Sequence, residues 1–474
     1  MAQQSFDVVV IGAGPVGQNL ADRARRGGLS VAIVESELVG GECSYWACIP
    51  SKALLRSGSA FRAARRVPGA REATTGVLDT AAVFARRNRF THDWTDDHEA
   101  EWLAGAGIEL FRGQGCITAP KRVSVTAKDG SVTELSAVHA VAVTTGTTAR
   151  IPDVPGLSDA RPWTTREAVS VQSLPASLAI IGGGAVAVEM ATAFTSFGTH
   201  VTIIARSRLL GRAEPFAGEL VAEALARAGV SIHLNVSPSS VSRTEAGISV
   251  NLNGATVTAD EVLVAAGRAP HTSGLGLDAL GLDSAALTNG WLNTDDTLLV
   301  RGTDWLYACG DVNHRALMTH QGKYQARAAG DSIAARANGS AVDDSPWGVH
   351  VATADHEAVP QVIFSEPEVA RVGLTAAAAE EAGYEIRVVD YDLGWVSGSS
   401  LHADDYQGRA RMVVDEQRRV VLGVTFVGQD VAELVHAATI AVVGEVPLDR
   451  LWHAVPAFPT MSEIWLRLLE QYGR

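Results

Sequence analysis

A glycine-rich turn that occurs twice, each time after a short and mostly apolar run, places a strong restriction on the fold of this 474-residue chain. The run 6–11 leads into IGAGPVG, and the run 178–181 leads into IGGGAVA. Such a run, followed by small residues and a helical pattern, predicts a β-strand, a tight turn and an α-helix that binds a dinucleotide pyrophosphate. The small residues are Gly12, Gly14 and Gly17 in the first copy and Gly182, Gly184 and Ala187 in the second. Two copies predict an α/β chain with two dinucleotide sites.

The first copy continues as a complete nucleotide-binding unit. A helical stretch runs to about Arg26, and a second strand over 29–34 ends at Glu35. Phosphates bind at a helix N-terminus because unpaired N–H groups and the positive end of the helix dipole face them. Glu35 lies 23 residues after Gly12, where a carboxylate can accept hydrogen bonds from a ribose diol.

The second copy differs where its second strand, 200–205, ends. Arg206, Ser207 and Arg208 follow that strand, and no acid is present there. An acid would repel a 2′-phosphate, whereas arginine binds phosphate through paired donors. We therefore predict a preference for NADP; the alternative is that these arginines only cap a surface loop. Two sites imply two nucleotides, most economically FAD in the first and NADPH in the second.

Two cysteines, Cys43 and Cys48, lie five residues apart in GGECSYWACIPSK. In an ideal helix five residues give a rise of about 7.5 Å and a rotation of about 140°, whereas a disulfide requires Cα atoms within about 7 Å. A regular helix therefore cannot bridge them, and its first turn must be distorted. Pro50 supplies a reason, because it cannot donate to the carbonyl of Trp46. A strained, partly exposed disulfide is easy to reduce; the alternatives are two buried thiols or a metal site.

Composition narrows the class of protein. The net charge of −14 disfavours nucleic acid and an anionic membrane surface as partners. The N-terminus has no basic region ahead of its first strand, and the apolar runs are too short to span a bilayer, so we expect a cytoplasmic protein. Four cysteines are too few for a secreted disulfide scaffold. Cys116 and Cys309 are expected to be buried small hydrophobes. The cluster Arg86, Arg87 and Arg89 is expected to be a solvated helix face.

The rest of the chain predicts how the domains are joined. Strand-like runs over 141–148 and 262–267 would carry the chain between domains, and a strand over 305–312 ends at Gly310 and Asp311. Asp311 would hold a flavin ribityl hydroxyl or serve as a plain N-cap. Further cofactor contacts are predicted at Gly41, Thr145, Gly146, Gly267 and Arg268.

The predicted architecture has two Rossmann-like, doubly wound, three-layer domains and a C-terminal α+β dimerisation domain. From about residue 343 alternating strands and long helices replace the nucleotide pattern. The predicted division is 1–150 and 271–345 for an FAD-binding domain in two parts, 151–270 for an NAD(P)H-binding domain and 346–474 for dimerisation.

The order of these motifs resembles that of the class I pyridine nucleotide–disulfide oxidoreductases, which include lipoamide dehydrogenase, glutathione reductase and mercuric reductase. GGECSYWACIPSK resembles their redox-active motif, although Ala47 stands where they usually carry Gly; YACGDV resembles their second flavin motif and FPTMSE their dimer-interface motif. VTIIARSRLLGRAEP is similar to the NADPH loop of mercuric reductases. The resemblance implies a homodimer in which Cys43 attacks the substrate and Cys48 lies against the isoalloxazine ring.

The resemblance also implies a charge partner for Lys52, four residues after Cys48. A lysine at this position would favour reduced, anionic flavin and a thiolate at Cys48. In the family it pairs with a glutamate on the first helix of the nicotinamide domain, which is Glu189 here. The alternative is an ordinary surface lysine and an ordinary helix glutamate. Ala185 replaces the tyrosine that often covers the flavin in the family, which predicts a less gated nicotinamide pocket.

The C-terminal motif departs from the family. Its disulfide reductases place a histidine before Pro-Thr, oriented by a glutamate five residues later, and such acid–base help is worth roughly 10²–10⁴-fold. Here Phe458 occupies that position, while Glu463 is retained. Three alternatives stay open. His453 replaces the missing histidine, or the acceptor needs no proton, as for a metal ion or a quinone. In the third, the acceptor is a disulfide or other small molecule with an acidic leaving group. His320 is another candidate proton donor, against a capping or core role.

Together these motifs predict an FAD-containing, NADPH-dependent oxidoreductase that passes electrons through the Cys43–Cys48 disulfide to a small molecule. The alternatives are a mercuric-reductase-like enzyme whose FAD reduces a metal ion or quinone directly, and a nucleotide-sensing flavoprotein with little turnover. The chain lacks the C-terminal cysteine pair of mercuric reductases. Tyr45 and Trp46 are either a stacking surface for a planar substrate or packing residues.

Overall fold

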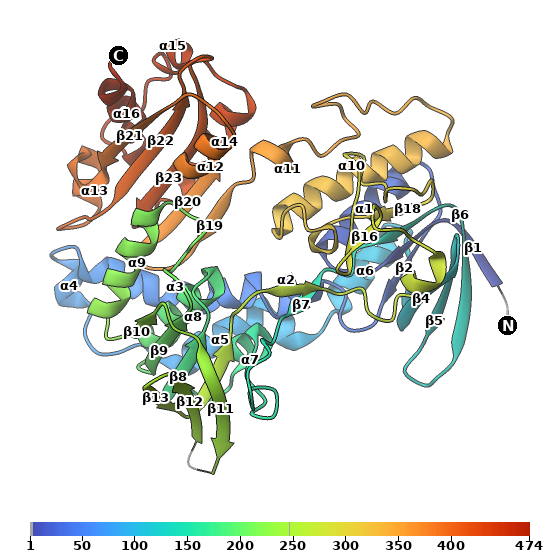
Figure 1. Cartoon of the computed structure of the whole chain (residues 1–474), viewed down its shortest axis with the longest axis horizontal. Helices are drawn as coiled ribbons and strands as arrows, with labels where there is room; N and C mark the ends of the chain where they lie inside the picture. Colours follow the sequence, from blue (N-terminus) through green and yellow to red (C-terminus); the bar gives the residue numbers. More distant parts are fainter. Residues whose placement is uncertain (1–2, 246) are drawn as a thin grey trace. The chain divides into compact units, whose positions relative to one another are not determined.

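The computed structural model describes residues 3–245 and 247–474. They form two compact units, each assembled from three stretches of chain. The first unit comprises residues up to Pro50, Asn88–Thr148 and Arg268–His356. The second comprises Ser51–Arg87, Ala149–Gly267 and Glu357–Arg474. The predicted fold class is confirmed: one mixed and one parallel α/β sheet are present, together with a C-terminal α+β domain (Figure 1). The predicted division into four segments stays a prediction.

The first unit is built on a mixed sheet with the order β3-β2-β1-β6-β5-β4, and β18 pairs with β6. Its strands are β1 (Gln3–Ile11), β2 (Val31–Glu35), β3 (Glu109–Arg112), β4 (Gln114–Ala119), β5 (Arg122–Thr126), β6 (Val132–Val143) and β18 (Leu306–Ala308). Strands β1, β2, β3, β6 and β18 pair in parallel, while β4 and β5 extend the edge as an antiparallel hairpin. Strand β18 is shorter than predicted, so Gly310 and Asp311 lie beyond it.

Alternation along β1 explains why this sheet is buried on both faces. Val8 and Val10 face the cluster made with α1 (Pro15–Arg26) and α10 (Thr319–Ala337), whereas Val9 and Ile11 face the cluster made with the β4–β6 hairpins. Because successive side chains of a strand point to opposite faces, an unbroken apolar run supplies two cores. The other elements of the unit are α2 (Gly41–Tyr45), η1 (His92–Trp94), α6 (Asp97–Gly105), β7 (Thr147–Ala149), β15 (Arg268–Pro270), η2 (Leu277–Leu280), β16 (Leu287–Thr288), β17 (Trp291–Leu292), η3 (Asp311–Asn313) and α11 (Ala354–Glu357).

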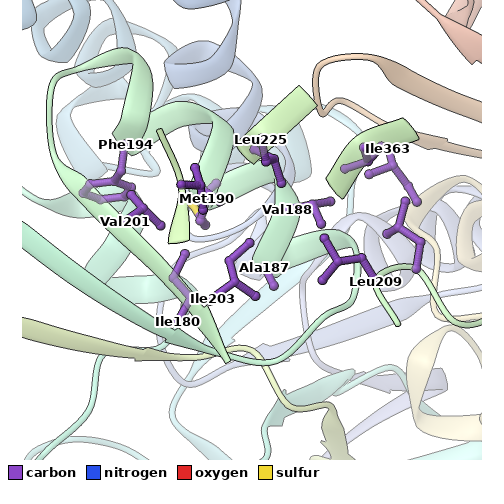
Figure 2. Packing of buried hydrophobic residues seen from close by; sticks show 14 of the residues in the cluster. Ile180, Ala187, Val188, Met190, Phe194, Val201, Ile203, Leu209, Leu225 and Ile363 are labelled. Carbon is purple, nitrogen blue, oxygen red and sulfur yellow. The ribbon is translucent and has the colours of Figure 1, made fainter. Parts of the chain in front are cut away.

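The second unit contains the other parallel sheet, in the order β10-β9-β8-β14. These strands are β8 (Ser177–Ile181), β9 (His200–Ala205), β10 (Ser231–Leu234) and β14 (Glu261–Val264), beside the antiparallel β11 (Pro238–Thr244), β12 (Gly247–Leu252) and β13 (Ala255–Ala259). The helices are α3 (Cys48–Arg65), whose first residues belong to the first unit, α4 (Ala70–Ala73), α5 (Thr80–Phe90), α7 (Thr165–Ser170), α8 (Ala185–Ser196) and α9 (Pro215–Arg227). Figure 2 shows Met190 and Phe194 of α8 packed over Ile180 and Ile203 of the sheet.

The C-terminal part of the second unit is a five-stranded antiparallel sheet in the order β19-β20-β23-β22-β21. Its elements are β19 (Gln361–Ile363), β20 (Glu368–Gly373), α12 (Ala376–Glu381), β21 (Ile386–Asp392), η4 (Leu393–Trp395), α13 (Ser397–His402), β22 (Arg409–Asp415), β23 (Val420–Gly428), η5 (Ala432–Leu434), α14 (Val435–Val443), α15 (Leu448–Leu451), η6 (Met461–Glu463) and α16 (Ile464–Tyr472). No helix within the described ranges is long and apolar enough to cross a bilayer.

The predicted solvated arginine face on α5 is wrong at its centre. Arg87 is fully buried, and its guanidinium donates to the carbonyls of Val169 (3.0 Å) and Val171 (2.6 Å) at the end of α7. Burial lowers the pKa of Arg87 to about 10. The chain uses this cation to satisfy the unpaired carbonyls of a helix C-terminus, a role that spacing alone did not reveal.

Candidate active site

Cys43 and Cys48 stand on two different helices that meet at a break. Cys43 lies in the middle of α2, and Cys48 is the first residue of α3. Between the helices Trp46 has φ −134° and ψ 5°, and its N–H returns to the Glu42 carbonyl over 2.7 Å. The predicted irregular path is confirmed, but its cause differs from the predicted one. Pro50 lies in the first turn of α3, where a missing N–H costs nothing, so the break precedes the proline.

The two thiols touch, and a threonine from a distant part of the chain contacts both. The Thr319 hydroxyl donates to Cys43 Sγ over 3.3 Å and lies 3.4 Å from Cys48 Sγ. The hydrogen bond with Cys48 and then burial raise the pKa of the Cys43 thiol, while Thr319 and the charge of Lys323 act in the opposite direction. The structure holds both residues as thiols, partly buried.

The first glycine-rich turn has the shape that a pyrophosphate requires. A Cβ at Gly12 would lie 2.7 Å from the Thr144 carbonyl oxygen, and one at Gly17 would lie 1.9 Å from the Gly12 carbonyl oxygen. A Cβ at Gly14, in contrast, would meet nothing nearer than the Gly41 Cα at 4.0 Å. No side chain of the described residues caps the N-terminus of α1. The turn therefore combines tight packing below with an open, uncapped helix end above, which fits an anionic dinucleotide.

Glu35 lies beside this turn at the end of β2. Its carboxylate accepts the N–H groups of Ala13 and Glu37, each over 2.8 Å. Burial raises the pKa of the Glu35 carboxyl, although these backbone donors oppose the change. A partly buried acceptor at this position suits the hydroxyl donors of a ribose.

A network around Arg268 connects the cysteine segment to the second predicted flavin motif. The Arg268 guanidinium binds the Glu42 carboxylate and donates to Thr147 Oγ1 (2.5 Å) and to the Thr147 carbonyl (2.7 Å). Thr147 in turn donates to Asp311 Oδ2 over 2.8 Å. Burial raises the pKa of the Asp311 carboxyl, against the effects of Thr147 and Arg268. Asp311 follows the N-cap, which is Gly310.

The remaining predicted cofactor contacts of the first unit lie on neighbouring turns. Gly41 is so close to Gly14 that a Cβ there would lie 2.9 Å from the Gly14 Cα. The Thr145 hydroxyl donates to the His271 carbonyl over 2.6 Å, and the Gly146 carbonyl accepts the His271 N–H. A Cβ at Gly310 would lie 3.0 Å from Val16 at the start of α1. Gly41 and Gly310 therefore lie beside the first turn.

The predicted ion pair between Lys52 and Glu189 is present in the second unit. Lys52 Nζ lies 2.8 Å from Glu189 Oε2, and the other carboxylate oxygen accepts the Phe364 N–H over 3.0 Å. The Lys52 ammonium also lies 5.2 Å from the centre of the Phe364 ring. Only 6% of the Glu189 side chain is exposed, against 36% for Lys52.

The second glycine-rich turn repeats the geometry of the first. A Cβ at Gly182 would lie 2.2 Å from the Ala265 carbonyl oxygen, whereas one at Gly184 would meet nothing within 4 Å. The two arginines after β9 differ. Arg208 donates to the Gly211 and Ala213 carbonyls of its own loop, as the loop-capping alternative foresaw.

Arg206 is exposed, and it makes no hydrogen bond or ion pair with any described residue. Its guanidinium is therefore the one at the end of β9 that is available to a ligand. Gly267, the other predicted contact of this unit, is exposed, with its carbonyl accepting the Arg150 N–H over 3.0 Å.

The C-terminal candidates lie together on one stretch of the second unit. Phe458 is 73% exposed, and His453 is exposed on the same stretch. Glu463 is buried in η6: its Oε1 binds Arg467, while Oε2 has no hydrogen-bond partner among the described residues. His320, in the first unit, is the exposed second residue of α10, next to Thr319.

Two expectations about side chains change. Tyr45 is fully buried, and its phenol donates to the Thr95 carbonyl, so it cannot stack on a substrate; Trp46 is only partly buried. Of the two isolated cysteines, Cys309 is buried as predicted, whereas Cys116 is partly exposed. The motifs did not predict a role for Thr319, whose only sequence signal is its place beside His320 at the head of a helix.

Comparisons with known proteins match most of the chain. Residues 6–329 match the family model of the pyridine nucleotide-disulphide oxidoreductases, and residues 359–468 match the model of their dimerisation domain. The chain is 33% identical over 466 residues to dihydrolipoyl dehydrogenase of Chlorobaculum tepidum, covering 97% of this chain and 95% of that protein. It is 28% identical over 468 residues to mercuric reductase of Staphylococcus aureus, covering 97% and 81%.

Solved structures share the fold. The HOCl-induced flavoprotein disulfide reductase RclA from Escherichia coli superposes with a TM-score of 0.83 at 24% identity, covering 98% of this chain and 99% of that one. LpdA from Mycobacterium tuberculosis gives the same TM-score and identity, covering 99% and 100%.

Proposed function

Because this chain belongs to the pyridine nucleotide-disulphide oxidoreductase family of FAD-dependent enzymes, we propose that it oxidises NADPH and reduces a small molecule through the pair Cys43 and Cys48. The observation that carries the proposal is the contact of these two thiols across a helix break, with Thr319 bound to both. Two thiols in contact can close to a disulfide with little movement, and a disulfide that reforms readily can cycle.

The residues of the first unit suit FAD. The open helix end at Gly14, bounded by Gly12 and Gly41, would hold the pyrophosphate, Glu35 the ribose and Asp311 the ribityl chain. When bound, FAD supplies a carrier that accepts a hydride from a nicotinamide and passes on an electron pair. The chain's own contribution is to orient that carrier and to hold the thiol pair.

The thiols take different roles in this proposal. The hydrogen bond between the two thiols raises the pKa of Cys43 and stabilises negative charge on Cys48, while Thr319 and the charge of Lys323 favour the Cys43 thiolate that an attack on the acceptor requires. Lys52, held by Glu189, adds a positive charge one helical turn after Cys48. This arrangement agrees with Cys43 as the interchange thiol and Cys48 as the thiolate beside the flavin.

The preference for NADPH rests on Arg206. It follows β9 at the place where NAD-binding units carry an acid, and its guanidinium is available to a 2′-phosphate. Arg208 is a weaker candidate because its donors serve loop carbonyls.

The proposed class of electron acceptor rests on Phe458 and Glu463. Phenylalanine cannot transfer a proton, and the exposed ring leaves the Glu463 oxygen without the histidine that it would orient. This favours a small disulfide or other small molecule with an acidic leaving group. It also favours a second candidate, in which FAD reduces a metal ion or quinone directly, because such acceptors need no proton from the protein. The dimerisation domain and exposed apolar residues such as Val455 and Ile440 support a homodimer.

The variants Cys43→Ser and Cys48→Ser test the proposal. We expect each to abolish NADPH-dependent reduction of an aromatic disulfide and to spare direct reduction of a quinone. Cys116→Ser, on a strand of the same unit, is the matched control and should keep both activities. Full disulfide reduction by either serine variant would contradict the role of the pair.

A further inference from the structure

Residues 92–99 bind Tyr45, one of the four residues between the two cysteines. The Trp94 indole N–H donates to the Tyr45 carbonyl over 3.1 Å. The buried Tyr45 phenol oxygen lies 3.0 Å from the Thr95 carbonyl and 3.2 Å from the Glu99 carboxylate, which share its single proton. One stretch of chain therefore binds both the main chain and the side chain of Tyr45.

The bond from Trp94 acts at the helix break. Helix α2 has five residues, so its last carbonyls have no partner inside the helix. The Trp46 N–H donates to the Glu42 carbonyl, and the Trp94 indole N–H donates to the Tyr45 carbonyl. Together these two bonds hold the end of α2 at the point where the chain turns to bring Cys48 beside Cys43.

The turn that presents Trp94 is conformationally costly. His92, Asp93 and Trp94 have φ of 48°, 49° and 57°, three consecutive L-residues in the left-handed region without a glycine among them. A left-handed run is unfavourable for L-residues, and such backbone persists where the surrounding structure over-determines it, often at functional sites. A turn that only reversed the chain would need no such run. Here it directs an indole donor at one carbonyl of the redox segment.

We propose that Trp94, placed by this left-handed turn, is a positioning residue that favours closure of the Cys43–Cys48 disulfide. The inference rests on the proposed redox role of that pair. Holding the Tyr45 carbonyl restricts the freedom of the dithiol segment before the bond forms, and pre-organisation of this kind lowers the cost of closing a ring. A bond that was only structural would stabilise the dithiol and disulfide forms equally, and the equilibrium between them would not change.

The test is the thiol–disulfide equilibrium of the FAD-loaded protein in glutathione buffers. Closure removes two electrons and two protons from the pair and converts one glutathione disulfide into two glutathione thiols. Alkylation and mass analysis of the peptide that carries both cysteines give the oxidised fraction. Trp94→Phe removes the donor and keeps an aromatic ring, and we expect the equilibrium constant for disulfide formation to fall about tenfold, because the backbone of one more residue must then be ordered when the bond closes. A tenfold change corresponds to about 30 mV.

Trp102→Phe is the matched control, because Trp102 belongs to the same unit and is 43% exposed. It should keep the wild-type constant. Asp93→Gly, which relieves the strain and keeps the indole, should remain within twofold of wild type. Equal constants for Trp94→Phe and wild type would overturn the inference.

The benzothiophene analogue of tryptophan at position 94 provides a second route should Trp94→Phe fail to fold. It keeps the size of the ring system and lacks only the N–H that binds the Tyr45 carbonyl, so the constant should fall; an unchanged constant would overturn the inference. A wild-type pair that never forms a reversible disulfide would instead refute the proposed function. The two failures are therefore distinguishable.

Discussion

Replacing Gly14 by alanine should leave the protein folded and weaken FAD binding. Gly14 has φ −67° and ψ 179°, a conformation open to any residue, and a methyl group there would meet nothing nearer than the Gly41 Cα at 4.0 Å. Gly→Ala at a compatible site stabilises a protein by about 0.4–1 kcal/mol. The apo protein should therefore unfold at the same or a slightly higher temperature.

The expected loss of FAD affinity follows from the space that the methyl group takes. This space borders the uncapped end of α1, where a pyrophosphate would approach the backbone. Loss of one hydrogen bond to a charged group costs about 1.5–3 kcal/mol, which raises Kd about 10- to 150-fold. Gly17→Ala should also lower the unfolding temperature of the apo protein. Its Cβ would lie 1.9 Å from the Gly12 carbonyl oxygen, so the turn itself must shift.

The assay separates binding from folding. FAD is removed, the apo variants are titrated with FAD while flavin fluorescence is followed, and the unfolding temperature of each apo protein is recorded. Gly105→Ala, in α6, also points into open space and should bind FAD like wild type. The reasoning is refuted if Gly14→Ala keeps its FAD affinity within twofold, or if it loses affinity only together with apo stability.

Three further predictions concern charged groups. Lys52→Met leaves the buried Glu189 carboxylate without its cation and should lower the unfolding free energy by about 1–3 kcal/mol. The loss is smaller than for a fully buried pair because Lys52 is partly exposed. Denaturant unfolding that detects no loss of stability would contradict this prediction. Arg206→Glu should raise the KM for NADPH about tenfold or more and change the KM for NADH little. Arg208→Glu should raise the KM for NADPH less, because Arg208 donates to loop carbonyls. An equal rise of the KM for NADPH in the two variants, measured by steady-state kinetics, would contradict the assignment. Burial raises the pKa of Glu368 from 4.5 to about 7, so its contribution to stability is complete below pH 4.5 and is lost as the pH rises through 7. Relative to Glu368→Gln, wild type should therefore lose up to about 3 kcal/mol between pH 5 and pH 8, and parallel stability curves for the two proteins would contradict the shift.

Local sequence predicted the parts of the site that depend on neighbouring residues. The strand, turn and helix around Gly12 and Gly182 follow from short-range backbone sterics, so the glycines lie where their spacing predicted. The break between Cys43 and Cys48 was predicted because helix geometry forbids their closure in one helix. The resemblance to a family added the Lys52–Glu189 pair, which no local rule connects across 137 residues.

The tertiary structure decided what distant segments bring to these elements. Thr319 contacts Cys43 across 276 residues of sequence, and Trp94 reaches the Tyr45 carbonyl across 49. Arg208 turns back onto its own loop, and Arg87 is buried against a helix end, although both are arginines that composition would place in solvent. By itself, the sequence determined the two nucleotide-binding turns and the cysteine spacing, because bond geometry and side-chain size act over a few residues. Only packing decided which donors face the thiols, since that depends on how segments far apart in the chain share one core.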